Sequence, residues 1–384
     1  MLVNGFVIAD MHDGLIDPET YYERKEKLIL DKIDNMPILD FIVFCGDTLH
    51  SKQYFSSNVV IYLIRFIKNL IQRTEDKNTT IVFIEGTREH DAVQTKSIME
   101  IFESDRFKVY TTVTKDTLCG MNVLYIPEEY VVDMDSYYEE YFNVEEKYDM
   151  IFGHGMVDKI WFSKRNDAET GMNKVTRVPV FKVEQLTSIA HYTYFGHIHT
   201  RKFYGEDNRF KYVGSFDRYE FGQEEVKGYY NVAYNTETKH AQEDFIVNDM
   251  ALVLSTKIIN IAEDIPVPEL NEKMNRVINE SLEHCDRLRI IVNINTTLNT
   301  FNIMKDFMMQ KVGNIKGVSL SIVKNMTEEE VEAIDKEITK REIMGGVIYD
   351  KSIPIEEKIA TYIHNKSGKN ISAEEIRQFL EMTI

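Results

Sequence analysis

The sequence predicts an α/β protein whose functional residues follow the ends of strands. Short apolar runs alternate with amphipathic stretches over the first two thirds of the chain. The first three runs and the two stretches between them give a β-α-β-α-β order, which is typical of a parallel sheet. Polar residues and glycines follow these runs directly, and open α/β sheets carry their sites at that end of their strands. We therefore expect the chemistry to gather at one sheet edge.

The first part of this region alternates strands and helices. Gly5–Ala9, Asp40–Cys45 and Thr80–Ile84 are short apolar runs that predict buried strands. Glu23–Asp34 and Asn58–Arg73 repeat apolar residues at helical spacing and predict the helices between those strands. Each of the three strands is followed within a few residues by an aspartate or a histidine.

The second part of the region is richer in strands. An acidic, tyrosine-rich stretch lies between Val131 and Asp149, and we expect it to be a solvated surface helix or loop. Around it stand five further strand candidates: Asn122–Ile126, Met150–Phe152, Tyr192–Phe195, Phe210–Val213 and Gly228–Tyr234.

A small α/β module is predicted after residue 248. Leu252–Ile261, Arg287–Ile294 and Val318–Val323 predict its strands. Glu269–Cys285 and Asn299–Val312 predict the helices between them. The module carries no cluster of catalytic residue types, so we expect the chemistry in the first region.

The remaining residues predict charged helices. Thr327 with Glu330, and Ser372 with Glu375, form capping-box patterns. Short helices with apolar stripes either dock on their own domain or bind a partner, and the sequence leaves both interpretations open. These boundaries divide the chain into three parts: residues 1–248, 249–325 and 326–384.

The composition is that of a folded, acidic protein. The chain has 384 residues, 43% hydrophobic and 28% charged, which excludes wholesale disorder. With 63 acidic and 45 basic residues, the formal net charge is −18, which disfavours a protein that holds DNA by its own charge. A nuclease whose positive charge comes from bound metal stays possible. No apolar run approaches the ~20 residues of a membrane span, so we expect no membrane partner.

The cysteines favour a reducing compartment. The chain has three of them, Cys45, Cys119 and Cys285, which are far apart and form no CxxC pair. This spacing argues against a disulfide scaffold and against a thiolate zinc site.

Six of the ten histidines stand in polar clusters directly after apolar runs. Glycine lets the chain turn sharply at a strand end, so that the next side chain can face a cavity. His50 follows the second cluster, and Glu89 begins the third. Five segments recur in order along the chain: Asp10-Met11-His12, Gly46-Asp47, His90-Asp91, Gly153-His154-Gly155 and Gly196-His197-Ile198-His199.

The spacing within these segments favours metal binding. Residues i and i+2 of an extended segment point the same way, so Asp10 and His12 can reach one ion together. The same holds for His197 and His199. Imidazoles mixed with carboxylates suit Mn²⁺, Fe²⁺ or Zn²⁺. Two ions about 3.5–4 Å apart would use all these ligands, with Asp47 as the natural bridge.

Each segment alone has a simpler explanation. An isolated Asp-x-His or Gly-His-Gly is common, and a lone histidine is more often a surface or core residue than a ligand. Five such segments in this order, each after a strand, are hard to obtain by chance, so we prefer the two-metal interpretation. We assign no role to the histidines outside the segments: His191, His240, His284 and His364.

This series of segments resembles the calcineurin-like metallophosphoesterase superfamily and, more narrowly, the nuclease subunit of the Mre11/SbcD family. His50 completes Gly-Asp-Thr-Leu-His, which is similar to that family's Gly-Asp-x-x-His. The module after residue 250 stands where the family has its DNA-capping domain. A further stretch resembles the family segment that follows the last metal motif; it contains Tyr212-Val213-Gly214-Ser215, Arg218, Phe221-Gly222 and Lys227-Gly228.

The resemblance implies a fold and a set of metal ligands. The fold is a metallophosphoesterase β-sandwich flanked by helices, followed by a small α+β capping domain and C-terminal helices. One metal would be held by Asp10, His12, Asp47 and His199. The other would be held by Asp47, His154, His197 and Glu89.

The ligand at Glu89 departs from the family pattern. The family has Gly-Asn-His followed by an acid, and its asparagine binds metal, whereas this chain reads Gly86-Thr87-Arg88-Glu89-His90-Asp91. Aligned from the histidine, Glu89 takes the ligand position; aligned from the glycine, Thr87 does. We prefer Glu89, because a carboxylate binds hard cations more strongly than a hydroxyl. This variant and the short chain resemble the viral or phage branch of the family.

The implied activity is Mn²⁺-dependent DNA cleavage, exonucleolytic from 3′ ends and endonucleolytic on single strands. A water between the ions would lose a proton near neutral pH and attack phosphorus in line. His90 would stabilise the transition state or protonate the leaving oxygen, and His50 would orient the phosphodiester or assist that step. The implied partners are DNA, a Rad50/SbcC-type ATPase bound through the C-terminal helices, and a second copy of the chain. The implied location is the cytoplasm, that of the host if the protein is viral.

Two other functions stay open from the sequence. A different calcineurin-like phosphoesterase would act on phosphoproteins or nucleotides. A scaffold would keep the fold with an impaired site, as the missing asparagine allows. We prefer the nuclease because every other ligand position of the family pattern is filled.

Overall fold

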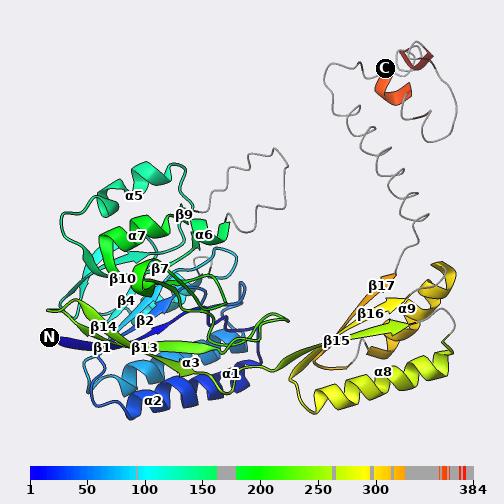
Figure 1. Cartoon of the computed structure of the whole chain (residues 1–384), viewed down its shortest axis with the longest axis horizontal. Helices are drawn as coiled ribbons and strands as arrows, with labels where there is room; N and C mark the ends of the chain where they lie inside the picture. The colour runs from blue at the N-terminus through cyan, green and yellow to red at the C-terminus, as the bar shows by residue number, and fades with distance from the viewer. Residues whose placement is uncertain are drawn as a thin grey trace. The chain divides into compact units, whose positions relative to one another are not determined.

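The first 247 residues contain two six-stranded sheets, seen in a computed structural model. It describes residues 1–91, 94–161, 179–261, 265–294, 298–312 and 315–324, with 354, 357–360, 363, 372 and 375–377. The first sheet has the order β14-β13-β1-β2-β3-β4, in which β1 to β4 are parallel and β13 and β14 form an antiparallel hairpin (Figure 1). Its strands are β1 (Leu2–Ile8), β2 (Phe41–Cys45), β3 (Thr80–Ile84), β4 (Phe107–Tyr110), β13 (Gly228–Asn235) and β14 (His240–Val247).

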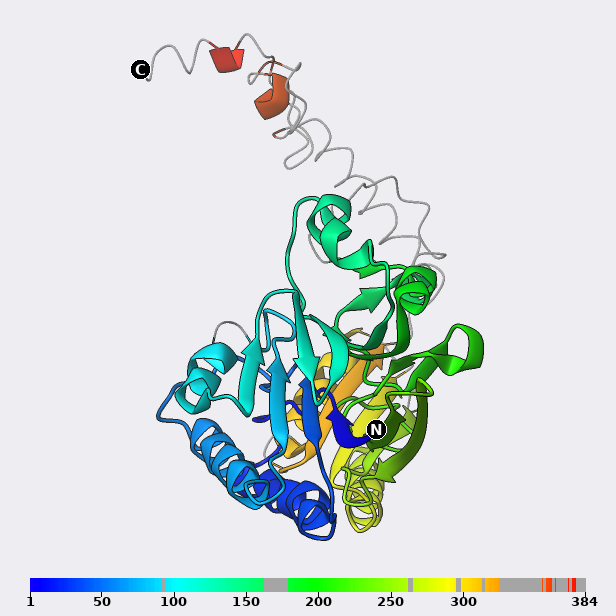
Figure 2. The same ribbon diagram turned by 90° about the vertical axis from the view of Figure 1, so that its left-hand side faces the viewer.

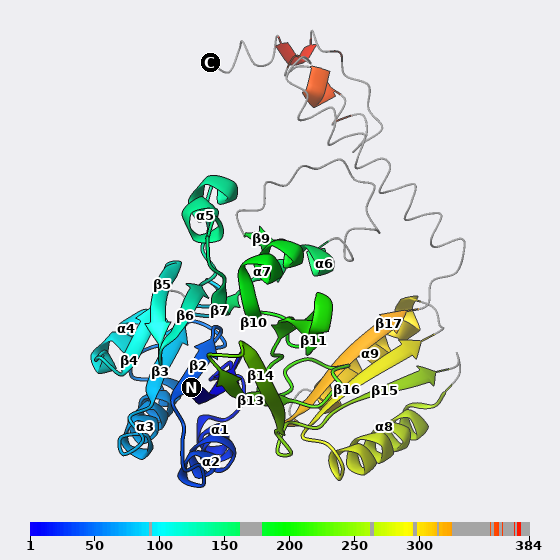
Figure 3. The same ribbon diagram turned by 60° about the vertical axis from the view of Figure 1, so that its left-hand side comes forward.

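The second sheet has the order β11-β12-β10-β7-β6-β5 (Figure 3). Its four central strands are parallel, and the two edge strands are antiparallel to their neighbours. The strands are β5 (Thr114–Leu118), β6 (Met121–Ile126), β7 (Tyr148–His154), β10 (Ala190–Gly196), β11 (Lys202–Tyr204) and β12 (Phe210–Tyr212). A separate two-stranded ladder pairs β8 (Met156–Val157) with β9 (Val180–Phe181).

The two sheets pack face to face, with helices on their outer faces. Along β2, Phe41, Val43 and Cys45 belong to the core between the sheets, whereas Ile42 and Phe44 pack against the helices. This alternation follows from the two-residue period of a strand, and it explains why the run is apolar throughout. The structure therefore confirms the predicted α/β class.

Figure 1 shows the helices above and below the pair of sheets. On the first sheet lie α1 (Pro18–Lys25), the π-helical turn η1 (Glu26–Leu30), α2 (Asp31–Asp34), α3 (Asn58–Arg73), α4 (Gln94–Met99) and the 3₁₀ turn η2 (Glu100–Phe102). On the second lie α5 (Met134–Phe142), α6 (Asp158–Trp161) and α7 (Val183–Ile189). A 3₁₀ turn, η3 (Glu206–Asn208), links β11 to β12.

Every strand predicted in this region coincides with an observed one, and α3 has the predicted bounds. The helix predicted over Glu23–Asp34 instead begins at Pro18. The Asp17 side chain caps it by accepting from the Thr20 amide at 3.1 Å, and proline is favoured at a first helical position. The acidic stretch contains α5, whose Tyr138 is buried in the outer core rather than solvated.

The spatial contacts divide the chain into two units: Met1–Thr256 with Ser281–Leu288, and Lys257–Glu280 with Arg289–Ile384. The predicted module is present as β15 (Leu254–Ile261), α8 (Val267–Leu282), β16 (Arg287–Ile294), α9 (Leu298–Val312) and β17 (Val318–Lys324). Its three strands form one sheet in the order β15-β16-β17.

One predicted capping box is confirmed further along the chain. The Ser372 hydroxyl accepts from the Glu375 amide at 3.2 Å, and the Glu375 carboxylate accepts from the Ser372 amide at 2.8 Å. The Thr327–Glu330 box lies outside the described residues. No helix in the described ranges is long and apolar enough to cross a membrane.

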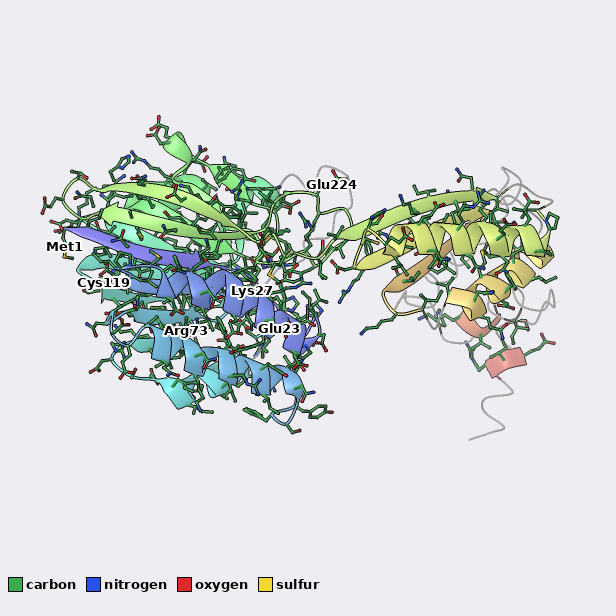
Figure 4. All side chains as sticks on the ribbon, turned by 90° about the horizontal axis from the view of Figure 1, so that it is seen from below. Met1, Glu23, Lys27, Arg73, Cys119 and Glu224 are labelled. Atoms are coloured by element: carbon green, nitrogen blue, oxygen red, sulfur yellow. The ribbon has the colours of Figure 1, made fainter. Side chains whose placement is uncertain are left out.

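Parallel strands bring their carboxyl ends to a common edge. Figure 2 looks onto the end of the first unit where β1 begins. In Figure 4, Met1 and Cys119 lie at that end, and Glu224, in the segment after β12, lies at the other. The residues that follow β1, β2, β3, β6, β7 and β10 therefore meet at the end away from Met1.

Candidate metal centre

The first group of candidate ligands gathers residues that follow β1 and β10. Ligand atoms of Asp10, His12 and His199 all lie within 4.8 Å of one another. The Nε2 atoms of His12 and His199 face each other at 2.9 Å. Asp10 is fully buried and accepts the His197 amide on Oδ1 at 2.9 Å. These side chains could hold one metal ion.

The second group gathers residues that follow β2, β7 and β10. Ligand atoms of Asp47, His154 and His197 lie within 4.8 Å of one another. His154 Nε2 lies 3.3 Å from Asp47 Oδ2. The same Asp47 oxygen lies 3.9 Å from His12 Nε2, so it stands between the two groups. Its position is the one that a bridging carboxylate needs.

Strand alternation predicted that the two residues of each Asp-x-His or His-x-His pair bind one ion together, and the structure differs from this. His197 and His199 belong to different groups, so they do not reach one ion together. Asp10 and His12 do share a group, but their φ angles are 49° and 51°, which is left-handed rather than extended backbone. Left-handed backbone at both residues, not an extended strand, therefore brings the two side chains together.

The tautomer of His154 is fixed by its backbone partner. Its Nδ1 lies 2.8 Å from the carbonyl oxygen of Cys45, and a carbonyl can only accept. Nδ1 therefore carries the proton, and Nε2 faces Asp47. Metal-binding histidines in proteins commonly donate their second ring nitrogen to a carbonyl in this way.

Burial and charge tune the ionisation of these groups. Burial lowers the pKa of His199 to about 4 and that of His12 well below its usual value, so both imidazoles are neutral near neutral pH. Burial raises the pKa of Asp10 to about 6. Burial opposes ionisation of Asp47 too, but His154 beside it holds the Asp47 pKa below its usual range. Burial opposes the charge of His154, but Asp47 beside it raises the pKa of His154 well above its usual value. Neutral imidazoles and ionised carboxylates are the forms that bind metal, so a metal ion bound at His154 would displace a proton.

The two predicted catalytic histidines lie beside the first group, and with His12 they form a third set of ligand atoms within 4.8 Å of one another. The ring centroids of His12 and His90 are 4.6 Å apart, and those of His12 and His50 are 5.5 Å apart. His90 Nδ1 bonds to the backbone carbonyl of His50, which fixes its tautomer and leaves Nε2 for other partners. Burial and the nearby His90 and Arg287 lower the pKa of His50.

Buried Asp91 orders the loops that carry these histidines. Its carboxylate accepts from the Leu49 amide at 3.0 Å and from the Gly86 amide at 2.8 Å. The Thr95 hydroxyl donates to it at 2.8 Å. One side chain thus ties the loop after β2 to the loop after β3.

The choice between Glu89 and Thr87 as the ligand stays a prediction, and the structure shows where each residue lies. Glu89 is exposed and belongs to none of the ligand groups found among the described residues. Thr87 lies inside the second group, with Oγ1 at 3.2 Å from Asp47 Oδ2 and 3.2 Å from His154 Nε2. The loop after β3 closes as a tight turn, in which the His90 and Asp91 amides bond to the Thr87 carbonyl. This turn carries Glu89 away from the site.

The sequence reasoning missed Glu128. Glu128 follows β6 and is a buried residue, and its carboxylate lies 3.1 Å from His197 Nδ1. The signal was present, because Asn122–Ile126 was predicted as a strand and Glu128 stands just after it. The rule that polar residues at strand ends form the site would have included it.

The segment resembling the family's last motif holds the backbone of His199. The Ser215 amide and the Lys227 ammonium both donate to the His199 carbonyl, at 3.0 and 2.8 Å. The Tyr219 ring lies edge-on to His12, and its hydroxyl donates to the Asp10 carbonyl at 3.0 Å. Tyr219 was likewise not predicted.

The donor set fits divalent cations. Asp10 Oδ2 is buried and has no hydrogen-bond partner among the described residues. The Nε2 atoms of His12 and His199 face each other at 2.9 Å, so one cation could bind both imidazoles. Buried carboxylates mixed with imidazoles suit Mn²⁺, Fe²⁺ or Zn²⁺.

No protein-family model matches this chain, and no curated protein matches it. The function therefore has to be inferred from the site itself and from the motifs that the sequence carries.

Proposed function

We propose that this chain is a metal-dependent nuclease that hydrolyses DNA phosphodiesters with two divalent ions. We propose that both ions are Mn²⁺. The observation that carries the proposal is the pair of ligand groups that meet at Asp47. The order of the motifs along the chain and their resemblance to the Mre11/SbcD nucleases support it. The resemblance also suggests 3′ exonuclease and single-strand endonuclease activity.

The residues around the ions have separate tasks in this proposal. Bound divalent ions polarise a phosphodiester and lower the pKa of water, which supplies a nucleophile near neutral pH. Asp47 would serve both positions, and the bond from His154 Nδ1 to the Cys45 carbonyl leaves His154 Nε2 facing the second one. His90 has its Nδ1 bonded to the His50 carbonyl, so its doubly protonated form would give the Nε2 proton to the leaving oxygen or stabilise charge on the phosphoryl oxygens. His50 would orient the phosphodiester.

The partners follow from the same resemblance. We propose that DNA, a Rad50/SbcC-like ATPase and a second copy of this chain are the partners, with the ATPase bound through the C-terminal helices. An acidic chain would gain from an ATPase that supplies an extended basic surface. Cys45 and Cys119 form no disulfide within the described part of the chain, which suits our placing of the protein in the cytoplasm.

A nuclease assay with Mn²⁺ tests this function. Wild type should cleave labelled single-stranded DNA, and His90→Ala should lower turnover by about 10²–10⁴-fold, the usual contribution of a general acid. Asp47→Ala should abolish turnover and also lose bound Mn²⁺, measured by equilibrium dialysis. His240→Ala, which alters an exposed histidine on β14, is the control and should behave as wild type.

Other outcomes would favour the other functions. Hydrolysis of bis(p-nitrophenyl) phosphate without DNA cleavage, with or without an added ATPase, would favour a different phosphoesterase. Failure to bind Mn²⁺ together with no hydrolysis of either substrate would favour a scaffold with an impaired site.

A further inference from the structure

We propose that Glu128 is a ligand of the second metal ion and replaces the asparagine that the resembled family has at this site. The inference rests on the proposed two-metal site and goes beyond it, because no motif of the chain points to this residue. It assigns the second ion the ligands Asp47, His154, His197 and Glu128.

The position of the Glu128 carboxylate carries the proposal. Its Oε2 lies 3.1 Å from His197 Nδ1, 3.8 Å from His154 Nε2 and 3.4 Å from Thr87 Oγ1. Both histidines belong to the second ligand group. A cation held by these imidazoles therefore has the Glu128 oxygen within reach.

The burial of Glu128 needs a cationic partner. Its side chain is 1% exposed, and a buried carboxylate is costly unless it is paired or binds metal. Its ionic partners are His197 and His154, which are the residues that would bind the metal.

A backbone hydrogen bond holds Glu128 in place, and the next residue, Glu129, forms its hydrogen bonds with other groups. The Glu128 amide donates to the Glu85 carbonyl at 3.3 Å, which joins the ends of β6 and β3. The adjacent Glu129 accepts from the Val113 amide at 2.8 Å and from the Tyr137 hydroxyl at 2.6 Å. Of the two consecutive glutamates, Glu128 is the one that turns into the site.

Thr87 supports the site without filling the ligand position by itself. Its amide donates to Asp47 Oδ1 at 2.6 Å, and its hydroxyl can donate to Asp47 Oδ2 at 3.2 Å. A hydroxyl used in this way orients the bridging carboxylate. A neutral hydroxyl is also a weaker ligand for a hard cation than a carboxylate is. The Glu128 carboxylate, which follows β6, is therefore a stronger metal ligand than the Thr87 hydroxyl.

The resulting ligand sets are alike. Each ion has two imidazoles and one carboxylate of its own, and both share Asp47. An asparagine would leave the second position with one negative charge fewer. We therefore expect the two ions to bind with similar affinities, and we expect loss of the Glu128 charge to weaken one of them selectively.

Mn²⁺ binding to the full-length chain tests the assignment. Wild type should bind two ions by equilibrium dialysis and give the electron paramagnetic resonance signal of a coupled Mn²⁺ pair. Glu128→Gln keeps the shape but removes the charge; it should weaken the second equivalent at least about tenfold and abolish the coupled signal. Glu89→Gln is the matched control, because Glu89 was the alternative from sequence, and it should keep both ions. Two tightly bound ions in Glu128→Gln, or loss of one in Glu89→Gln, would overturn the proposal.

A second measurement covers the case in which Glu128→Gln does not fold. Anomalous diffraction from wild-type crystals soaked in Mn²⁺ should show an ion about 2.0–2.3 Å from a Glu128 oxygen. An ion at His154 and His197 that Glu128 does not contact would refute the assignment. DNA cleavage is measured separately. Bound ions without DNA cleavage would refute the proposed nuclease function. DNA cleavage by the wild type, together with unchanged Mn²⁺ binding in Glu128→Gln, would refute only the assignment of Glu128 as a ligand.

Discussion

At the scale of single residues, several candidate ligands have backbone conformations that L-amino acids rarely adopt. The φ angles of Asp10, His12 and Asp47 are 49°, 51° and 49°, and that of His197 is 89°. Such conformations cost about 1–3 kcal/mol each and persist where the surroundings hold them. Here the Asp10 amide donates to the Gly46 carbonyl at 3.2 Å, and the His12 amide to the Asp47 carbonyl at 2.9 Å. The loops are thus held in the arrangement that points the ligands inward.

Asp149 is a single residue that joins the two sheets away from the site. From β7 it accepts the Tyr234 hydroxyl of β13 and the Lys239 ammonium, both at 2.6 Å, and the Asn122 amide of β6 at 2.8 Å. We expect Asp149→Asn to lower the free energy of unfolding by about 1–3 kcal/mol, because a buried donor loses its charged acceptor. Urea unfolding at pH 7 measures this, with the exposed Asp105→Asn as control.

The same variant should show a defined pH dependence. Burial favours protonation, but Lys239 and Tyr234 hold the pKa of Asp149 below its usual 3.8. A lowered carboxyl pKa gives stability that is fully present above the unfolded pKa and is lost as pH falls through the folded one. The difference between wild type and Asp149→Asn should therefore be constant from about pH 5 upward and shrink below about pH 4. A difference that persists unchanged at lower pH would contradict this account.

At the scale of elements, the strands of the two six-stranded sheets that the sequence did not reveal are the four sheet edges. They are β4 and β14 in the first sheet and β5 and β11 in the second. Edge strands pair on one side only and are partly solvated, so their sequences mix polar with apolar residues. In β5, which reads Thr-Lys-Asp-Thr-Leu, only Leu118 is buried. Central strands are buried on both faces and therefore stood out as apolar runs.

The turn after β2 gives a prediction at this scale. Gly46 has φ +79°, and a Cβ there would collide with the His154 ring. We expect Gly46→Ala to destabilise the fold and to weaken Mn²⁺ binding at least about tenfold, because His154 must shift from its position. Chemical denaturation and an Mn²⁺ titration measure the two effects.

Gly120 offers a matched control for Gly46. It has φ +80° in the turn between β5 and β6, but the nearest atom to a Cβ is Met1 Cε at 3.5 Å. Gly120→Ala should cost only the backbone strain of about 1–2 kcal/mol and leave Mn²⁺ binding unchanged. Equal Mn²⁺ affinities in the two variants would show that the close packing of Gly46 against His154 does not position the site.

At the scale of the whole molecule, the net charge gives a prediction about the proposed binding to DNA. With a formal charge of −18, the chain alone should bind DNA weakly, with Kd no tighter than about 10⁻⁶ M at physiological salt. Affinity should fall steeply between 50 and 200 mM salt, since phosphate contacts release counterions. Fluorescence anisotropy of His90→Ala with Mn²⁺ measures this without cleavage, and removal of Mn²⁺ by EDTA should weaken binding further. Tight, salt-insensitive binding by the chain alone would contradict it.

The sequence by itself determined the central strands, α3 and the aspartates and histidines of the two ligand groups. Apolar periodicity marks buried strands, and turn residues with ligand side chains mark their ends, so both signals are local. It did not determine which ligands share a group. His197 and His199 are two residues apart, yet they face different partners.

Only the tertiary structure decided the place of Thr87, Glu89 and Glu128. The turn after β3 turns Thr87 inward and carries Glu89 out to solvent. The pairing of β6 with β7 brings Glu128 beside His154, across a sequence separation that no local pattern spans. Ligand choice depends on distances of a few ångströms between strand ends, and these distances are set by strand order and loop conformation rather than by spacing along the chain.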